Sequence, residues 1–119
     1  MPMMNNKQTG TAFEQEVVEY FRAKGYWVHF IAPDARGAQP FDIIAVKNGF
    51  AIAVECKTLA DTEKSFPIDR LEDNQKFAFD YWERCGNAEP LIAVKWRGKI
   101  KFIGWDKLRS NTNSRVKME

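Results

Sequence analysis

The chain has 119 residues, of which 45% are hydrophobic and 13% aromatic, and its formal net charge is +2. This composition predicts one globular domain, residues 1–119, with a single sizeable core. No apolar run approaches the roughly 18 residues of a membrane span, and the polar start lacks a secretory signal, so we expect a cytoplasmic protein. Two cysteines and one histidine, His29, argue against a disulfide framework, a zinc cluster and a Ser-His-Asp triad.

Charge is distributed unevenly along the sequence. From Lys95 onward eight basic residues stand against two acidic ones, whereas residues 1–94 carry ten basic and fourteen acidic residues. A basic segment beside an acidic one is what a protein needs to hold a polyanion next to a bound cation. The alternative interpretation is that the basic residues are solvated lysines on an edge strand. The candidates for contacts with phosphates in this segment are Lys95, Arg97, Lys99 and Lys101.

The first helix is expected over about residues 11–24, after a flexible leader over residues 1–10. Thr11 and Glu14 have the spacing of a capping box, and Gly25 supplies the stop at the other end. Glu14 also shares a side with apolar residues of the helix. It therefore either points inward or closes the capping box at the solvent edge of the first turn.

A strand and a loop follow the first helix. Residues 26–31 are rich in aromatic and β-branched residues, which favour a strand. Residues 32–40 have the composition of turns. The arginine of this loop, Arg36, either reaches a phosphate of the substrate or is a solvated loop charge.

Residues 39–57 predict one β-hairpin. Asn48-Gly49 between two apolar runs is the strongest short-range hairpin signal, because a type I′ turn needs positive φ at both central positions. A two-residue loop also fixes the register of the two strands. With that register, Asp42 lies directly opposite Glu55.

Two acids and a lysine converge on one face of this hairpin. Side chains alternate between faces along a strand, so Glu55 and Lys57 share a face with Asp42, whereas Phe41 and Cys56 point the other way. Like charges opposite one another on a sheet are destabilising. A bound cation would reverse the sign of that penalty.

The second helix is expected from about Asp69, an acid suited to the N-cap, to Cys85. Gln75 falls in the middle of its apolar face. Because buried amides need hydrogen-bond partners, Gln75 either caps backbone groups of the neighbouring sheet or reaches the carboxylate site.

Two more strands are expected, at residues 91–94 and 99–103, before a polar tail over residues 110–119 that we expect to be frayed. The element order is then α-β-β-β-α-β-β. This order predicts an α/β or α+β fold built around one mixed sheet.

The acids of the hairpin suggest a metal site. Asp42 and Glu55 are adjacent hard oxygen ligands, and Glu14 is a third that the first helix could supply, a set that suits Mg²⁺ or Mn²⁺. Lys57, beside a metal-bound water, could orient or help deprotonate that water and stabilise charge on a pentacovalent phosphorus. The implied reaction is hydrolysis of a phosphodiester.

Asp42, followed after twelve residues by Glu55-Cys56-Lys57, resembles the signature of the PD-(D/E)XK nucleases. Within that superfamily the chain is most similar to the archaeal-type Holliday junction resolvases. The resemblance extends to Gly10-Thr11-Ala12-Phe13-Glu14, Asp42-Ile43-Ile44-Ala45, Asn48-Gly49 and Gln75.

This resemblance implies a restriction-endonuclease-like sheet core flanked by helices. It also implies divalent metal bound by Glu14, Asp42 and Glu55, and a catalytic Lys57, with Gln75 as a further candidate for the active site. A homodimer is implied as well, because a two-fold axis matches the symmetry of a four-way junction.

We therefore expect a Mg²⁺-dependent endodeoxyribonuclease that cleaves DNA selectively at four-way junctions in recombination and repair. A restriction-like or phage-encoded repair nuclease acting on other DNA would use the same site residues. A third reading is a non-catalytic DNA-binding protein with a nuclease fold. The intact set of three carboxylates and one lysine argues against that third reading.

Overall fold

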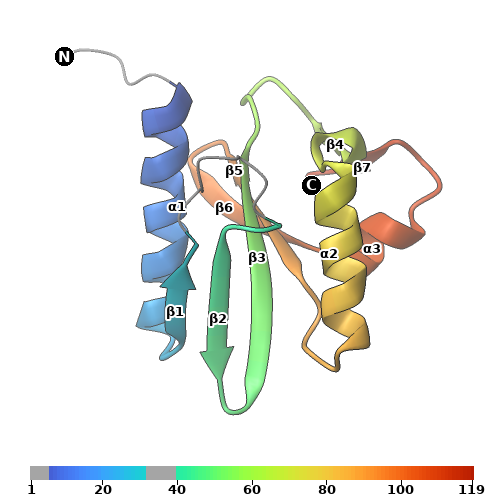
Figure 1. Cartoon of the computed structure of the whole chain (residues 1–119). Coiled ribbons are helices and arrows are strands. Elements are labelled where there is room, and N and C mark those ends of the chain that lie inside the picture. Colours follow the sequence, from blue (N-terminus) through green and yellow to red (C-terminus); the bar gives the residue numbers. More distant parts are fainter. Residues whose placement is uncertain (1–5, 32–39) are drawn as a thin grey trace.

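The computed structural model describes residues 6–31 and 40–119. A five-stranded sheet, with strand order β1-β2-β3-β5-β6, lies between α1 on one side and α2 with α3 on the other (Figure 1). The elements are α1 (Asn6–Ala23), β1 (Trp27–Phe30), β2 (Ile43–Lys47), β3 (Phe50–Thr58), β4 (Ser65–Pro67), η1 (Ile68–Arg70), α2 (Asp73–Arg84), β5 (Leu91–Trp96), β6 (Lys99–Gly104), α3 (Trp105–Ser110) and β7 (Arg115–Lys117).

The main sheet is mixed, as the sequence predicts. Strands β3 and β5 pair in parallel, and the other neighbours in this sheet pair antiparallel. The parallel connection runs through α2, in the manner of a crossover between parallel strands. The expected fold class, a mixed sheet flanked by helices, is confirmed.

The sheet is covered on both faces by apolar side chains. Phe13 and Val17 of α1 pack in one cluster with Val54 of β3. Phe79 of α2 and Trp105 of α3 pack in a second cluster, on the opposite face. Strands buried on both faces have nearly continuous apolar sequences, which explains the run at the start of β5. No helix in the described part of the chain is long and apolar enough to cross a membrane.

The hairpin forms with the predicted turn and register. Asn48 and Gly49 have φ values of 52° and 81°, which a type I′ turn requires. The pairs run from Lys47 opposite Phe50 to Ile43 opposite Val54. The local chemistry of the turn is therefore enough to fix how β2 lies against β3.

Both helix starts differ from the expectation. The first helix begins at Asn6, so that residues 6–10 of the expected leader are helical. The second begins at Asp73, with Glu72 as its N-cap, and Asp69 lies instead in the short η1. The chain leaves the helical region between these two elements because the residue after η1 is extended, with φ −87° and ψ 127°.

The tail at residues 110–119 is ordered, contrary to the expectation. Its strand β7 pairs antiparallel with β4, and Val116 and Met118 are buried in the core with 3% and 0% of their surface exposed. Met118 N–H also donates to the Lys64 carbonyl oxygen at 3.1 Å. Alternation of exposed and buried residues over this short strand explains why its composition reads as polar.

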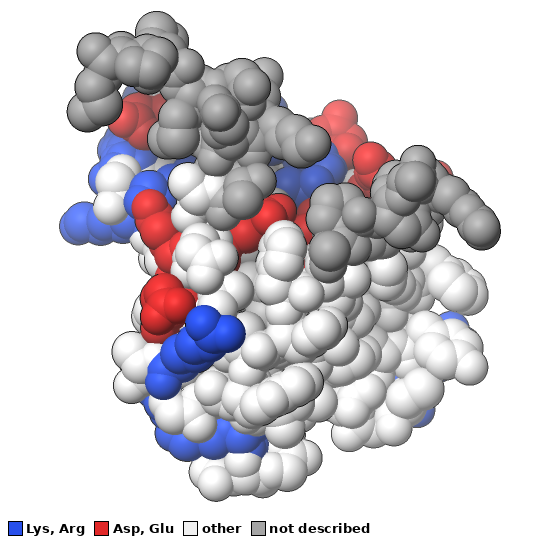
Figure 2. Space-filling model, turned by 60° about the vertical axis from the view of Figure 1, so that its left-hand side comes forward, with Lys and Arg blue, Asp and Glu red and all other residues white. Residues whose placement is uncertain are grey.

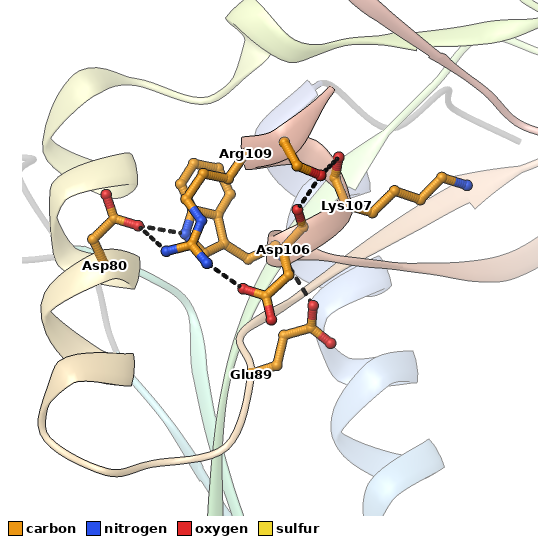
Figure 3. A network of polar contacts seen from close by, with 7 residues as sticks. Asp80, Glu89, Asp106, Lys107 and Arg109 are labelled. Carbon is orange, nitrogen blue, oxygen red and sulfur yellow. Dashed lines mark hydrogen bonds and ion pairs between the residues drawn. The ribbon is translucent and has the colours of Figure 1, made fainter. Parts of the chain in front are cut away.

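A polar network joins α2 to α3 (Figure 3). Asp80 of α2 accepts hydrogen bonds from Trp105 Nε1 at 2.8 Å and from Arg109 at 3.3 Å. Glu89 accepts from the Asp106 N–H at 2.9 Å, which satisfies a free amide in the first turn of α3. The contacts of Asp80 hold α2, the helix that carries Gln75, against α3.

Candidate active site

The site lies where β3 extends beyond β2. Strand β2 begins at Ile43, whereas β3 continues past Val54 to Thr58, paired only with β5 among the described strands. Asp42 Oδ2 accepts a hydrogen bond from the Cys56 N–H at 2.8 Å. The carboxylate of Asp42, 5% exposed, thus takes the position that a ladder partner would otherwise fill.

Glu55 is held beside this carboxylate by two neighbours, Gln75 and Lys57. It is 4% exposed, and its Oε2 accepts a hydrogen bond from Gln75 Nε2 at 2.7 Å. The ammonium of Lys57 lies 3.3 Å from the same oxygen. The other oxygen, Oε1, is buried without a hydrogen-bond partner.

Gln75 therefore reaches the carboxylate site, which was one of its two predicted roles. Its Nε2 donates to Glu55, while its Oε1 accepts from the Glu72 N–H at 3.1 Å. The second bond is half of a capping box at the start of α2, so the amide caps its own helix rather than the neighbouring sheet. Both ends of this amide have partners, which fixes the orientation of Glu55.

Glu14 approaches from α1, on the other side of the sheet. It is half-buried, and burial, with the Asp42 charge nearby, raises its pKa to about 7. Since α1 begins at Asn6, Glu14 is not in the first turn, which leaves the inward orientation of the two predicted alternatives. No group of three or more His, Cys, Asp or Glu within residues 6–31 and 40–119 is placed to hold a metal ion by itself.

Phe41 does not point where strict alternation places it. It packs against Phe79 at 6.5 Å between ring centroids and against Trp82 at 5.3 Å, on the α2 face where Glu55 also lies. The alternation rule fails here because Phe41 and Asp42 precede β2 and are not in its ladder. Phe41 thus closes the core on the same face as the site.

The family model for archaeal Holliday junction resolvase (Hjc) matches residues 5–119. The chain belongs to this resolvase family. It is 30% identical over 111 residues to the crossover junction endodeoxyribonuclease Hjc of Sulfurisphaera tokodaii, covering 90% of this chain and 73% of that protein. It is also 30% identical over 114 residues to the protein of the same name from Methanocaldococcus jannaschii, covering 96% and 79%.

A solved structure shares the fold of this family member. The Holliday junction resolvase Hjc of Archaeoglobus fulgidus superposes with a TM-score of 0.68 at 24% identity, over 92% of this chain and 88% of that one. The family resemblance predicted from the hairpin signature is therefore confirmed by the family model, and the predicted fold by this structure.

The negative charges of the carboxylates in this resolvase-family site are only partly compensated by neighbouring positive charge. Burial, followed by the neighbouring Asp42 charge, raises the pKa of Glu55 to about 8, although Lys57 and Gln75 act in the opposite direction. The unpartnered Oε1 of Glu55 and the adjacent Asp42 are the hard donors that Mg²⁺ or Mn²⁺ prefers. Because Mg²⁺ usually takes one or two carboxylates plus waters and substrate phosphates, this set fits such an ion.

The predicted DNA-contacting residues within the described part of the chain have different neighbours. Lys95 Nζ lies 2.6 Å from Glu16 of α1, and Arg97 Nη1 lies 2.9 Å from Glu119. Arg97, Lys99 and Lys101 line one hollow. Arg36 lies outside the described residues. Two of these cations are thus already paired with acids.

Arg70 lies near the site, and no pattern in the sequence marks it as a candidate. Its Nη1 donates to the Thr58 carbonyl oxygen at 3.0 Å, directly after Lys57 in the chain. The residue lies in η1, between two predicted elements. A contact between a loop residue and a strand end twelve residues earlier follows no periodic pattern.

Proposed function

We propose that this protein is a divalent-metal-dependent endodeoxyribonuclease that hydrolyses phosphodiester bonds at four-way DNA junctions, with Mg²⁺ as the ion and Mn²⁺ as a substitute. The observation that carries the proposal is the convergence of Asp42, Glu55 and Lys57 at the open end of β3. Membership of the archaeal Holliday junction resolvase family supports the substrate, as do the relatives named crossover junction endodeoxyribonuclease.

Each residue of the site has a separate role in this reaction. A metal ion held by Asp42 and Glu55, with Glu14 nearby, would supply a Lewis acid and an activated water. Lys57 keeps its ammonium beside Glu55 and can stabilise negative charge on the phosphorus being attacked. Gln75 fixes the orientation of Glu55 through the hydrogen bond described above. It acts as a positioning residue.

Cleavage by site variants tests the proposal. Asp42→Asn and Lys57→Ala should each lower cleavage of a labelled four-way junction by about 10²–10³-fold or more, since each removes a charge at the reacting phosphate. Binding to the junction in EDTA should remain largely intact. Lys107→Ala, an exposed residue of α3, is the matched lysine control and should cleave like the wild type.

The choice of substrate and metal separates the competing functions. The wild-type protein is incubated with a four-way junction, linear duplex and single strand, each in Mg²⁺, Mn²⁺ or EDTA. Symmetric nicks confined to the junction support the proposal. Equal cutting of linear duplex would select a nuclease on other DNA, and no cutting of any substrate with metal present would leave a DNA-binding protein.

We also propose that the protein acts as a homodimer joined through the outer face of α2. Phe77 and Tyr81 on this face are 65% and 57% exposed, and with Pro40, Phe41 and Trp82 they line a shallow apolar hollow. Figure 2, which is turned so that the α1 side of the molecule comes forward, shows charged side chains gathered beside a broad uncharged area. The hollow on α2 is placed by its lining residues, which are mainly apolar and contiguous. Contiguous exposed apolar surface of this kind marks interaction sites. A two-fold dimer would present two active sites to opposing strands of the junction.

A further inference from the structure

We propose that Arg70 is a substrate-positioning residue that binds a DNA phosphate next to the one that is cut. The inference rests on the proposed nuclease function, and it names a contact of that same site. The guanidinium lies on the edge of β3 that has no partner strand beyond Val54 among the described residues.

Asp42 and Arg70 bind to the same edge of β3. Leu59 N–H donates to the Lys95 carbonyl oxygen of β5, so the backbone N–H and C=O of Leu59 both point toward β5. The N–H and C=O groups of successive residues point to opposite edges of a strand, whereas those of residues two apart point to the same edge. Thr58, like Cys56, therefore points away from β5, toward the side where β2 has ended.

Two of the backbone groups on this edge have side-chain partners of opposite charge. The Cys56 N–H donates to the carboxylate of Asp42, and the Thr58 carbonyl accepts from the guanidinium of Arg70. Two residues of a strand span roughly 7 Å. The guanidinium is therefore bound two residues further along the same edge than the Asp42 carboxylate. This distance along β3 is comparable to the distance between neighbouring phosphates of one DNA strand.

Arg70 is also a cation near the site with no acid of the described residues within ion-pair distance. Among the arginines of the described residues, only Arg70 and Arg84 lack a carboxylate within ion-pair distance. Lys57 is already paired with Glu55. An unpaired guanidinium beside a nuclease site has its charge available for a phosphate.

The guanidinium is held in place before any substrate arrives. One N–H is bonded to the Thr58 carbonyl, and the Cζ atom lies 5.9 Å from the ring centroid of the fully buried Phe66. Arginine presents five N–H donors in a planar fork, so donors remain for a phosphate, which arginine can bind in bidentate fashion. A fixed fork loses less conformational entropy on binding than a mobile side chain does.

Two substitutions separate phosphate binding from a purely structural role. Arg70→Gln retains an N–H donor for the Thr58 carbonyl and removes the charge, whereas Arg70→Lys retains the charge and removes the fork. Arg22→Ala, at the far end of α1 from Glu14, is the control that removes one exposed arginine elsewhere. Junction binding is measured in EDTA over a range of salt concentrations, and the melting temperature of each variant is recorded.

We expect Arg70→Gln to weaken junction binding about tenfold and to lower the slope of log affinity against log salt by about 1, because one phosphate contact is lost. Arg70→Lys should keep the slope with intermediate affinity, and Arg22→Ala should match the wild type. If Arg70→Gln binds with wild-type affinity and slope, or changes only the melting temperature, the inference is wrong.

The outcomes for Arg70 and for the proposed function remain distinguishable. Absence of cleavage by the wild-type protein would overturn the nuclease proposal, but the binding measurements would still test the phosphate contact. The converse outcome is that the wild-type protein cleaves junctions while Arg70→Gln binds them as Arg22→Ala does. That result would support the nuclease function and contradict the role proposed for Arg70.

Discussion

Glu55 is buried, and its neighbours provide partners for only one of its two carboxylate oxygens. Gln75 and Lys57 both contact its Oε2, whereas its Oε1 has no hydrogen-bond partner. A buried carboxylate with incomplete compensation prefers to hold a proton, which is why its pKa is raised to about 8. Ligands of a metal must be deprotonated, so loading the site releases a proton and becomes stronger as the pH rises.

The raised pKa of Glu55 predicts how the metal-free protein responds to pH. The folded state binds this proton more tightly than the unfolded state, so the stability it contributes is full below the ordinary pKa near 4.5 and is lost as the pH rises through about 8. Glu55→Gln, which mimics the protonated group, should not show this loss. Chemical denaturation in EDTA at pH 5.5 and 8.5 should show the wild type losing about 2–3 kcal/mol more than the variant.

Metal provides the complementary measurement. Mg²⁺ at pH 8.5 should restore stability to the wild type, because an ion replaces the lost proton, and it should have little effect on Glu55→Gln. Equal pH profiles for the two proteins would show that Glu55 is not protonated at neutral pH in the folded state.

At the scale of single residues, the sequence predicts a contact where the regular alternation and register of a strand pair continue up to the residues concerned. Asp42 and Glu55 are brought together because an Asn-Gly turn defines the register for the whole hairpin. The same alternation rule misplaces Phe41, because the regular ladder begins one residue after Asp42. The side-chain amide of Gln75 could be selected as a buried polar group, but its double role depends on where α2 begins.

At the scale of elements, the C-terminal strand supports the loop that follows Lys57. Arg115 donates to Ser65 Oγ at 2.6 Å and to Glu63 at 2.9 Å, and β7 pairs with β4 next to this loop. Trp96 Nε1 donates to the Glu63 carbonyl oxygen at 2.8 Å from the other side. The segment between β3 and α2 is therefore held by two elements distant in sequence.

Met118 tests whether this tail is part of the core. Its side chain is fully buried, so Met118→Ala should lower the free energy of unfolding by about 2–4 kcal/mol through lost contacts and a residual cavity. Lys117→Ala, the exposed neighbour, is the matched control and should change it by less than about 0.5 kcal/mol. Equal stabilities in urea denaturation would mean that the tail is frayed after all.

The elements that sequence reasoning found are those with a local signal. The central helices and strands have a periodic pattern over several residues and a turn or cap at an end. Strands β4 and β7 have three residues each and pair across about fifty residues of chain, so neither has a pattern of its own. Their pairing depends on burial of Phe66 and Val116, which only the assembled core supplies.

At the scale of the whole molecule, the outer face of α2 predicts the assembly. Phe77→Glu places a charge in the proposed dimer contact and should convert dimer to monomer in analytical ultracentrifugation. Phe50→Glu is the matched control, because Phe50 is equally exposed, at 65%, but lies at the turn of the hairpin. Phe77→Glu should also change paired cuts in the junction into single nicks.

Two results would contradict this assignment of the interface. A wild-type protein that sediments as a monomer at micromolar concentration would rule out a stable dimer. A dimer that Phe50→Glu disrupts and Phe77→Glu does not would place the contact on the hairpin instead.

The end of β3 that carries the site is also a strand edge, and exposed edges are templates for aggregation. Here two of the backbone groups on that edge are bonded to Asp42 and Arg70, so the charged groups proposed to bind metal and DNA would also hinder another chain from pairing with it. If these assignments hold, catalysis and solubility depend on the same side chains. A lineage that lost the nuclease activity could not discard Asp42 freely, because the bare edge would then favour self-association.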